Sequence, residues 1–345
     1  MRGDTKEQPG IRFLRGFGMA ALATALISCV VGWLLIHAPV GAEYWVAETL
    51  VVKRELARRW AGQPKVIVAG GSSVLYGVDA ESATQQLQRP VLNFGLHAGL
   101  RLESLLREVE QVTETGDAVV LALEPPFYTR TVPWNAWQVR NAIAWDYASW
   151  EVLSVTRKLE FLGSISPRLL AEMVFVTCQS WLGSEIIQQR LAFKRVEMIL
   201  DRYRTRTKPS EFRLSADHLN EHGDLLCTEG GEYQGPSGDL NEPRWISKQA
   251  FDCLAHFVQT QKTRGVRVCF AHPPYLAFDG AEASESAFRT EISGLGTLID
   301  RRGDLVFGRA DFFDGPLHLN ASGREQRTAR LVRSLRPWLS PEAVP

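Results

Sequence analysis

The segment VIVAGGSSVLYGVDA (residues 66–80) joins a β-branched run to two glycines and two serines. Its apolar part, Lys65–Ala69, is short and bounded by turn residues, which is typical of a strand buried on both faces. Gly70 and Gly71 permit a tight turn, and a helix is expected to begin near Asp79. A serine in such a strand-to-helix turn lies at the carboxyl edge of the sheet, where open α/β sheets bind ligands. A solvated turn with two small residues is the alternative interpretation.

Four further strand-like runs follow the first one, and helical patterns separate them. They are PVLNFG (90–95), AVVLALE (118–124), VRVCFAH (266–272) and DLVFG (304–308). Alternating strands and helices with right-handed crossovers imply a parallel sheet that is covered on both faces. We therefore predict an α/β fold with a doubly wound parallel sheet of about five strands.

The composition excludes some classes of partner and site. The 345-residue chain carries 39 Lys and Arg against 39 Asp and Glu, and 45% of its residues are hydrophobic. This apolar content is enough for a core. Because there is no basic field, nucleic acid is not expected as a partner. No C-x-x-C pair occurs, so we expect neither a metal site nor another cofactor.

An uncharged run of residues near the N-terminus, Phe17–Ile36, is long enough to cross a bilayer as a helix. Basic residues are frequent before this run and absent directly after it, which places the N-terminus in the cytoplasm and the remaining chain on the other side. Two alternatives are a signal-peptidase site at VGA (40–42) and a lipoprotein box at LISC (26–29). The length of the apolar run favours an uncleaved anchor.

These features divide the chain into several parts. They are a cytoplasmic N-terminus (1–16), a transmembrane helix (17–38), a juxtamembrane helix (39–62) and an α/β domain (63–338) with a helical insertion at about 129–245. The juxtamembrane helix is expected to be a stalk, not a site.

The insertion and the cysteines each leave two interpretations open. VPWNAWQVRNAIAWDYASW (132–150) presents either aromatic faces for sugar rings or tryptophans that fill an ordinary core. Beyond the anchor, one or two disulfides and unpaired thiols are both compatible with the cysteines at Cys178, Cys227, Cys253 and Cys269.

The segment ADFFDGPLHLNASGRE near the C-terminus places Asp314 and His318 four residues apart, directly before a predicted helix. Ser322 and Glu325 have the spacing of a capping box at the start of that helix. The loop leaves the carboxyl end of a predicted strand, so Ser72, Asp314 and His318 are expected to meet at one edge of the sheet. A serine, an imidazole that takes its proton and a carboxylate that orients the imidazole are the groups that acyl transfer needs.

On these residues the chain resembles the SGNH (GDSL-like) hydrolases and acyltransferases over roughly residues 63–338. The turn GGSS, the glycine of NFG and the block DGPLH occur in the order that this family shows. The resemblance implies a flavodoxin-like sheet with Ser72 as nucleophile, His318 as base and Asp314 as the residue that orients the base. It also implies an oxyanion hole made by the backbone N–H groups of Ser72 and Gly95.

The chain departs from the family pattern at several positions. Gly71 stands where the family motif has an Asp, and Glu124 stands where the family usually supplies an Asn donor. The Asp–His spacing is one residue longer than usual, which makes Asp311 a second candidate to orient the base. Ser73 competes with Ser72 as nucleophile. Further candidates to line the pocket are Ser73, Asn93, His97 and Glu124.

The resemblance and the predicted anchor together imply acyl transfer, most simply of an acetyl group, to hydroxyls of a cell-envelope or extracellular polysaccharide through an acyl-Ser72 intermediate. A multi-spanning membrane O-acyltransferase would supply the acyl group. The protein would sit in the bacterial inner membrane, with its catalytic domain on the periplasmic or extracytoplasmic side. An esterase with the same triad and a non-catalytic scaffold are the two alternatives.

Overall fold

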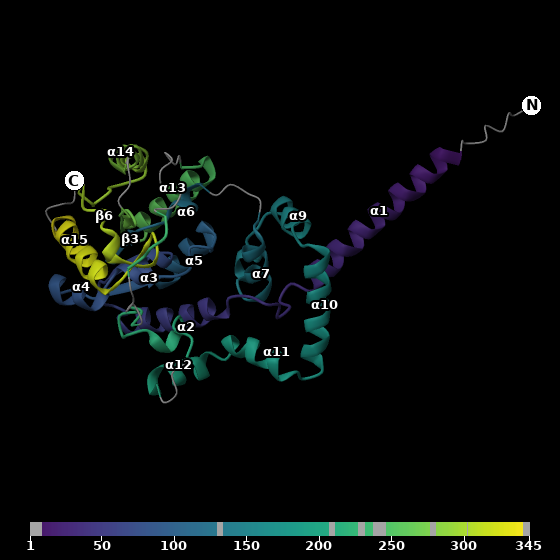
Figure 1. The fold of residues 1–345 in the computed structure, drawn as a ribbon, viewed down its shortest axis with the longest axis horizontal. Coiled ribbons are helices and arrows are strands. Elements are labelled where there is room, and N and C mark those ends of the chain that lie inside the picture. Colours follow the sequence, from purple (N-terminus) through teal and green to yellow (C-terminus); the bar gives the residue numbers. More distant parts are fainter. Residues whose placement is uncertain are drawn as a thin grey trace, which may run out of the picture. The chain divides into compact units, whose positions relative to one another are not determined.

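The computed structural model describes seven ranges of the chain. They are 9–129, 134–206, 211–226, 232–236, 246–276, 281–301 and 303–340. The chain forms two compact units (Figure 1). We call Met1–Tyr44 with Pro133–Ala192 the helical unit, and Trp45–Val132 with Phe193–Pro345 the sheet unit.

The sheet unit is built on four parallel strands in the order β2-β1-β3-β4. The strands are β1 (Val66–Gly70), β2 (Val91–Gly95), β3 (Ala118–Leu121) and β4 (Arg267–Phe270). Every residue of β1, β2 and β3 is buried, as expected for a parallel sheet with both faces covered. In this register Gly70 lies opposite Gly95, so the turns after β1 and β2 leave the same edge. The prediction of a mixed α/β fold with a parallel sheet is confirmed.

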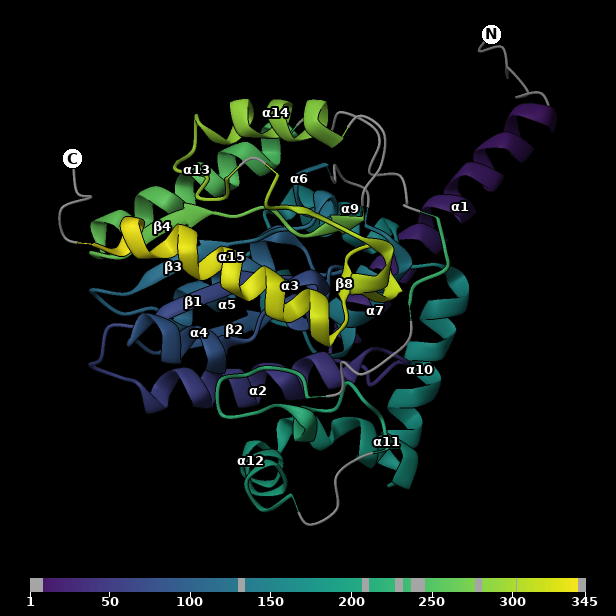
Figure 2. The same cartoon turned by 60° about the vertical axis from the view of Figure 1, so that its left-hand side comes forward.

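Helices cover the sheet on its two faces. One face packs on α3 (Ser72–Gly77), α4 (Ala80–Leu87) and α15 (Ala321–Leu339), through a cluster of small branched side chains from β1, β3 and these helices. Helix α15 crosses this face of the sheet in Figure 2. Helices α5 (Leu102–Val112) and α13 (Lys248–Thr263) contact β1 and β4 respectively, and they also contact each other.

The fifth predicted strand does not belong to this sheet. Of the run 304–308, only β6 (Val306–Phe307) is a strand, and it pairs with β5 (Tyr275–Leu276) in a separate two-stranded sheet. The edge of β4 is occupied by another segment, because the backbone of Phe270 exchanges hydrogen bonds with Thr297 and Ile299. The described part of the chain therefore has a main sheet of four strands where we expected about five.

A buried ion pair fixes α15 to the end of the sheet. The Arg327 guanidinium donates to Asp300 Oδ1 at 2.7 Å and to the His272 carbonyl at 2.8 Å. The other Asp300 oxygen accepts the N–H of His272 at 2.6 Å, and both charged side chains are buried. Because each charge has its partner, the cost of burying the pair is offset and the helix is held in one position.

The helical unit contains the apolar N-terminal helix. Its helices are α1 (Pro9–Leu34), α7 (Ala136–Ala144), α8 (Tyr147–Glu151), α9 (Val155–Gly163), α10 (Pro167–Trp181) and α11 (Glu185–Arg190), and the predicted insertion is thus shared between the two units. Within α1, the stretch Phe13–Leu34 is long and apolar enough to span a membrane, which is consistent with a single-pass anchor. Together, α9 and α10 pass the same test only as a pair bent by 95°.

Three tryptophans of the aromatic stretch belong to the core of the helical unit. Trp134, Trp145 and Trp150 are buried. The ring centroids of Trp134 and Trp150 lie 4.8 Å and 5.2 Å from that of Phe161. These three rings fill a core and present no face to a sugar.

The cysteines that the structure describes are unpaired. Cys178, Cys253 and Cys269 are free thiols, as is Cys29 in α1. Cys227 lies outside the described residues.

We predict that Gly95→Ala destabilises the protein because β2 packs directly on the backbone of α3. A Cβ at Gly95 would lie 2.2 Å from Leu75 N. Overpacking of this kind costs about 1–3 kcal/mol. Gly308→Ala is the matched control, since its Cβ would meet a single atom at 3.7 Å. Urea unfolding of both full-length variants in one detergent measures the difference, and equal stability of the two would contradict the packing.

Candidate active site

Ser72 lies at the carboxyl edge of the sheet, where β1 gives way to α3. It is the first residue of α3 and directly follows the turn glycines. Its side chain is half-buried, and its Oγ lies 2.8 Å from His318 Nε2. The strand-to-helix turn expected from the sequence therefore directs this hydroxyl at an imidazole that comes from the other end of the chain.

His318 and Asp314 come from one short hairpin. Strand β7 (Phe312–Gly315) pairs antiparallel with β8 (His318–Leu319), and the pairing has an irregularity in its register. The hairpin folds the chain back, so Asp314 Oδ1 lies 2.7 Å from His318 Nδ1 despite the four-residue spacing. Contacts between β8 and α3 bring this hairpin to the serine turn.

The hydrogen bonds of His318 select one arrangement of its protons. The bond to His318 lowers the pKa of Asp314, against a smaller opposing effect of burial, so the carboxylate stays ionised at neutral pH. A carboxylate accepts only, so the Nδ1 of a neutral His318 carries the proton and its Nε2 accepts the proton of Ser72. The side chains of His318 and Asp314 are 26% and 51% exposed, so small molecules can reach the pair.

An aromatic stack holds the face of the imidazole. The Tyr76 ring lies parallel to His318, with centroids 4.5 Å apart and an interplanar angle of 13°. Tyr76 also approaches Phe313, and the centroids of these two rings lie 6.1 Å apart. Tyr76 was missed by the sequence analysis. The available signal was its position four residues after Ser72 in a short helix, a spacing that puts both on one side.

Neither alternative candidate contacts His318 in this way. Ser73 is buried, and its Oγ has no hydrogen-bond partner among the described residues. Asp311 accepts a hydrogen bond from Gln326 Nε2 at 2.8 Å. The expected capping box at α15 is also absent. Asn320 caps the helix by accepting the N–H of Gly323 at 3.1 Å, while Ser322 Oγ points to Asp311 at 3.4 Å.

The Glu124 carboxylate holds the serine turn in place. It is fully buried just beyond the end of β3 and accepts the N–H of Gly71 at 2.9 Å and that of Ser73 at 2.7 Å. A Cβ at Gly71 would lie 2.7 Å from both carboxylate oxygens. The missing side chain at position 71 and the acid at position 124 are therefore complementary. A carboxylate cannot donate, so Glu124 lines no oxyanion hole as a donor.

The oxyanion donor expected at Gly95 is already engaged. The N–H of Gly95 donates to Asn93 Oδ1 at 2.9 Å. The N–H of Ser72 lies in the first turn of α3, where amides have no partner within the helix. Of the two predicted donors, the Gly95 N–H is thus bound to Asn93, whereas the Ser72 N–H lies at the open end of α3.

Asn93 belongs to a buried polar network, not to a pocket surface. The Lys53 ammonium donates to the carbonyls of Asn93 and Gly95 at 2.7 Å and 2.8 Å. The Asn93 amide donates to Asp224 Oδ1 at 3.2 Å, and Asp224 accepts the N–H of Ala80 at the start of α4. Lys53, Asn93 and Asp224 are all buried. The network fixes the end of β2 beside the serine turn.

Lys53 comes from α2 (Tyr44–Arg59), which we expected to be a polar stalk. The buried residues of α2 include Leu50, Lys53, Leu56 and Ala57, at the spacing of one helix face. Lys53 interrupts this apolar pattern. A charged residue on an otherwise apolar helix face was the sequence signal that could have identified a buried lysine. The helix is thus part of the sheet unit, and its Lys53 supports the site by binding the end of β2.

His97 remains a candidate to line the pocket. It follows β2, its Nδ1 accepts the N–H of Gly99 at 2.8 Å, and its ring lies 5.9 Å from that of Trp45. A Cβ at Gly71 would lie 2.8 Å from Ala98 Cα, so the loop that carries His97 runs beside the serine turn.

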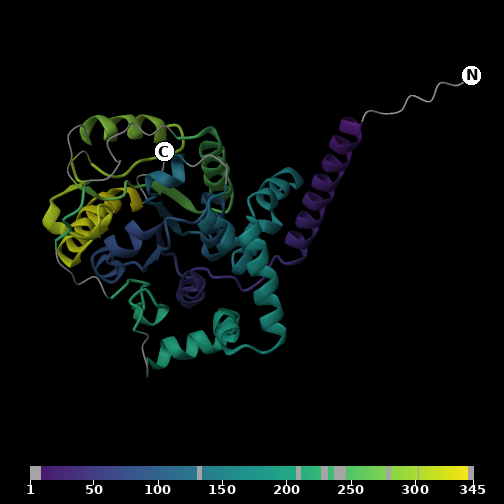
Figure 3. The same ribbon diagram turned by 45° about the vertical axis from the view of Figure 1, so that its right-hand side comes forward.

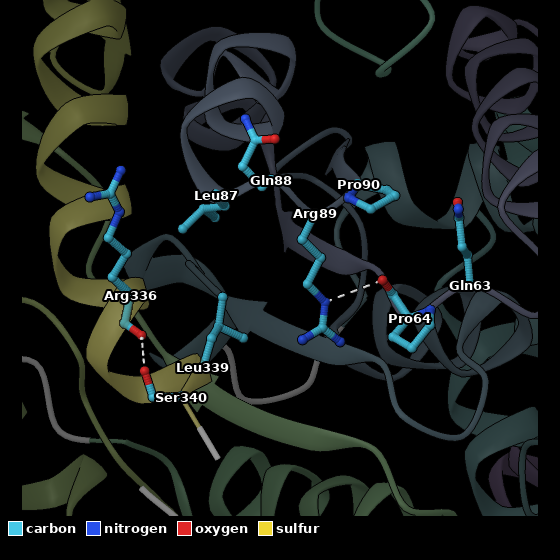
Figure 4. A pocket seen from close by; sticks show the side chains of 9 residues that line it. All are labelled: Gln63, Pro64, Leu87, Gln88, Arg89, Pro90, Arg336, Leu339 and Ser340. Atoms are coloured by element: carbon cyan, nitrogen blue, oxygen red, sulfur yellow. Dashed lines mark hydrogen bonds between the residues drawn. The ribbon is translucent and has the colours of Figure 1, made fainter. Parts of the chain in front are cut away.

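A cavity of about 520 Å³ lies at the opposite edge of the sheet (Figure 4). Its lining residues lie in the segments that precede β1 and β2 and at the end of α15. The Arg89 Nε donates to the Pro64 carbonyl at 3.2 Å, so its guanidinium is occupied by the protein. Within the described residues, no group of His, Cys, Asp and Glu side chains has the arrangement of a metal site.

No protein-family model matches the chain, and no curated protein matches it.

We predict that Glu124→Gln lowers the free energy of unfolding by about 1–3 kcal/mol, the usual cost of leaving a buried group unsatisfied. The amide would turn one NH2 donor towards a backbone N–H donor. Glu325→Gln on the exposed face of α15 is the control and should change stability by less than about 0.5 kcal/mol. Urea unfolding measures both. If Glu124→Gln behaves like the control, the carboxylate does not hold the turn.

Lys53 should make stability depend on pH. Burial lowers its pKa from 10.5 to about 7, against a smaller opposing effect of Asp224. Between these values the unfolded chain binds more protons than the folded protein, so the free energy of unfolding rises with pH across the window. Removing this contribution with Lys53→Met should flatten the rise by up to about 1.4 kcal/mol per pH unit.

The control for Lys53→Met is Lys248→Met, because the Lys248 side chain is 87% exposed. Urea unfolding between about pH 7.5 and 9.5 compares the three proteins, and this range lies inside the predicted window. Lys248→Met should keep the wild-type slope. Parallel curves for Lys53→Met and wild type would show that Lys53 keeps its proton when folded.

Proposed function

We propose that the sheet unit catalyses acyl transfer through an acyl-Ser72 intermediate, as the resemblance to the SGNH family implies. The observation that carries the proposal is the continuous chain of hydrogen bonds from Ser72 Oγ to His318 Nε2 at 2.8 Å and from His318 Nδ1 to Asp314 at 2.7 Å. A serine hydroxyl is a weak nucleophile until a base takes its proton, and this chain supplies the base and its orienting carboxylate.

In the first half of the reaction, His318 takes the hydroxyl proton as Ser72 Oγ attacks the acyl carbonyl. The tetrahedral intermediate collapses, the bond to the leaving alcohol breaks, and His318 returns the proton to that alcohol. In the second half, an acceptor hydroxyl gives its proton to His318 and attacks the acyl-serine. The new ester leaves, and the proton returns to Ser72 Oγ.

The Ser72 N–H is the donor that we assign to the developing oxyanion. Glu124 supports this assignment because its carboxylate binds the amides on either side, Gly71 and Ser73, and leaves the Ser72 amide between them. Preorganised N–H donors of this kind typically contribute a factor of about 10²–10³ to turnover. His318 is held for the same step by Asp314 on its edge and by Tyr76 on its face.

The acceptor that we propose is a hydroxyl of a cell-envelope or extracellular polysaccharide, and the acyl group is acetyl. A multi-spanning membrane O-acyltransferase is the proposed donor, and the bacterial inner membrane, with the sheet unit on its outer side, is the proposed location. The apolar helix α1 supports membrane attachment. Val40, in the alternative signal-peptidase site VGA (40–42), is buried, and its carbonyl accepts a hydrogen bond from the Tyr44 hydroxyl at 2.7 Å, which favours an uncleaved anchor.

A second candidate function is ester hydrolysis by the same three residues. The exposed Asp314 and the partly exposed His318 favour it, because water can reach the acyl-enzyme. The two reactions differ only in the second acceptor. Incubating the enzyme with a chromogenic acetyl ester and an excess of oligosaccharide separates them. Acetylated oligosaccharide is expected for a transferase, whereas free acetate alone would indicate an esterase.

We predict that Asp314→Asn reduces turnover of the acetyl ester by about 10⁴-fold, because the imidazole then loses the carboxylate that fixes its tautomer. Ser72→Ala should abolish turnover. The matched controls are Asp311→Asn and Ser73→Ala, whose side chains lie outside the hydrogen-bond chain to His318, and both should keep most of the activity. Unimpaired turnover in Asp314→Asn, or a dead Ser73→Ala variant, would show that we have named the wrong residues.

A further inference from the structure

The helical unit carries an exposed apolar surface that the proposed reaction does not use. Large apolar side chains of α8 to α11 that face solvent are Val152, Val155, Leu159, Val174, Phe175, Trp181, Leu182 and Ile186. Trp181 and Leu182 are 80% and 86% exposed. Exposed apolar patches of this kind mark contact surfaces.

On α10 these side chains form one continuous stripe. The adjacent residues Val174 and Phe175 precede Cys178 by four and three residues, and Trp181 follows Cys178 by three. All four are exposed, whereas Leu169, Met173 and Val176 of the same helix are buried. The stripe carries no charge. Between Leu169 and Ser184 the sole ionisable side chain apart from Cys178 is Glu172, which is turned away and paired with Arg140 at 2.8 Å.

The stripe belongs to helices that are fixed to the end of α1. A Cβ at Gly32 would lie 3.2 Å from Leu162 and 3.3 Å from Ile165, the residues at the elbow between α9 and α10. The rings of Trp33 and Trp150 lie 5.2 Å apart. Figure 3 shows the purple helix α1 meeting these teal helices at its carboxyl-terminal end.

The position of this junction follows from the length of α1. A helix needs about 20 apolar residues to cross a bilayer, and Phe13–Leu34 has 22. The whole stretch is therefore needed to cross, and its carboxyl-terminal end lies at the membrane surface. The ammonium of Lys158 lies 5.6 Å from the Trp33 ring and 5.5 Å from the Trp150 ring. Tryptophan and lysine side chains gather at this depth, where an apolar body meets a polar headgroup.

We propose that the elbow of α9 and α10 lies in the surface of the same bilayer, with the stripe of α10 facing the acyl chains. Helix α10 has 15 residues and is too short to cross, whereas an interfacial helix with one uncharged apolar face sinks about 5–10 Å into the headgroup region. This inference goes beyond the proposed acyl transfer and does not depend on it. It gives the helical unit two contacts with lipid, one through α1 and one through α10.

Labelling of Cys178 tests the proposal on the full chain. The protein, with Asp252→Cys added as an internal control, is placed as single copies in phosphatidylcholine nanodiscs and treated with a charged maleimide. Cys178 is exposed in the protein alone, and the Asp252 side chain lies on the charged surface of α13. Peptide mass spectrometry should show that Cys178 reacts at least about tenfold more slowly than residue 252.

Each other outcome would overturn the proposal. Equal labelling of the two thiols in nanodiscs would show that water covers the stripe. Protection of Cys178 in native membranes but not in nanodiscs would assign the stripe to a partner protein. Protection that appears only in discs holding two copies would assign it to a second copy of this chain.

Tryptophan quenching gives a second readout that leaves the cysteines unchanged. Nanodiscs of dibrominated phosphatidylcholine should quench part of the fluorescence, including that of Trp33 at the end of α1, and Trp181→Phe should reduce the quenched fraction. Trp60→Phe, in the sheet unit, is the matched control and should leave it in place. The same quenching in Trp181→Phe as in wild type would place Trp181 outside the lipid and contradict the proposal.

Discussion

The contact between the Glu124 carboxylate and the two amides that flank Ser72 is the interaction on which the site depends. Hydrogen bonds from backbone N–H groups to a buried carboxylate are roughly twice as strong as neutral ones. The carboxylate reaches the turn from the end of β3, which neighbours β1, so the register of the sheet decides where it lies. Its oxygens occupy the space that any side chain at Gly71 would need. The turn GGSS and the acid at position 124 therefore form one unit.

The base approaches this turn from the far end of the chain, 246 residues away in sequence. Two devices hold it there. The hairpin of β7 and β8 brings the Asp314 carboxylate to the edge of the His318 ring, and Tyr76 covers the face of that ring. Behind the hairpin, the buried pair of Arg327 and Asp300 fixes α15. The catalytic geometry that we propose thus depends on contacts between segments that are far apart in the sequence and meet only in the folded protein.

Much of the fold could be predicted from the sequence because it rests on local patterns. The short buried runs that became β1 to β4 are bounded by turn residues, and the glycines before Ser72 mark a strand-to-helix turn. The same patterns placed Ser72, Asp314 and His318 at one edge, where the structure has them in hydrogen-bond contact.

What the sequence did not predict depends on which partner a group finds in three dimensions. Glu124 occupies a position where we expected a donor or a pocket residue, and it serves as an acceptor because Gly71 makes room for it. The backbone N–H of Gly95 donates to the side chain of Asn93, two residues earlier in the same strand. The run 304–308 does not extend the main sheet, because the backbone around Leu298 pairs with β4 at that edge. Propensity carries no information on such competition between segments.

The most direct test of the central claim is covalent trapping of the nucleophile. The full-length protein in detergent is treated with a fluorophosphonate, and the modified residue is found by peptide mass spectrometry. An activated serine should carry the adduct at Ser72 in wild type, and His318→Ala, which removes the base, should react far more slowly. A wild-type protein that stays unmodified, or that is modified at Ser73 or elsewhere, would contradict a Ser72-centred acyl-transfer site.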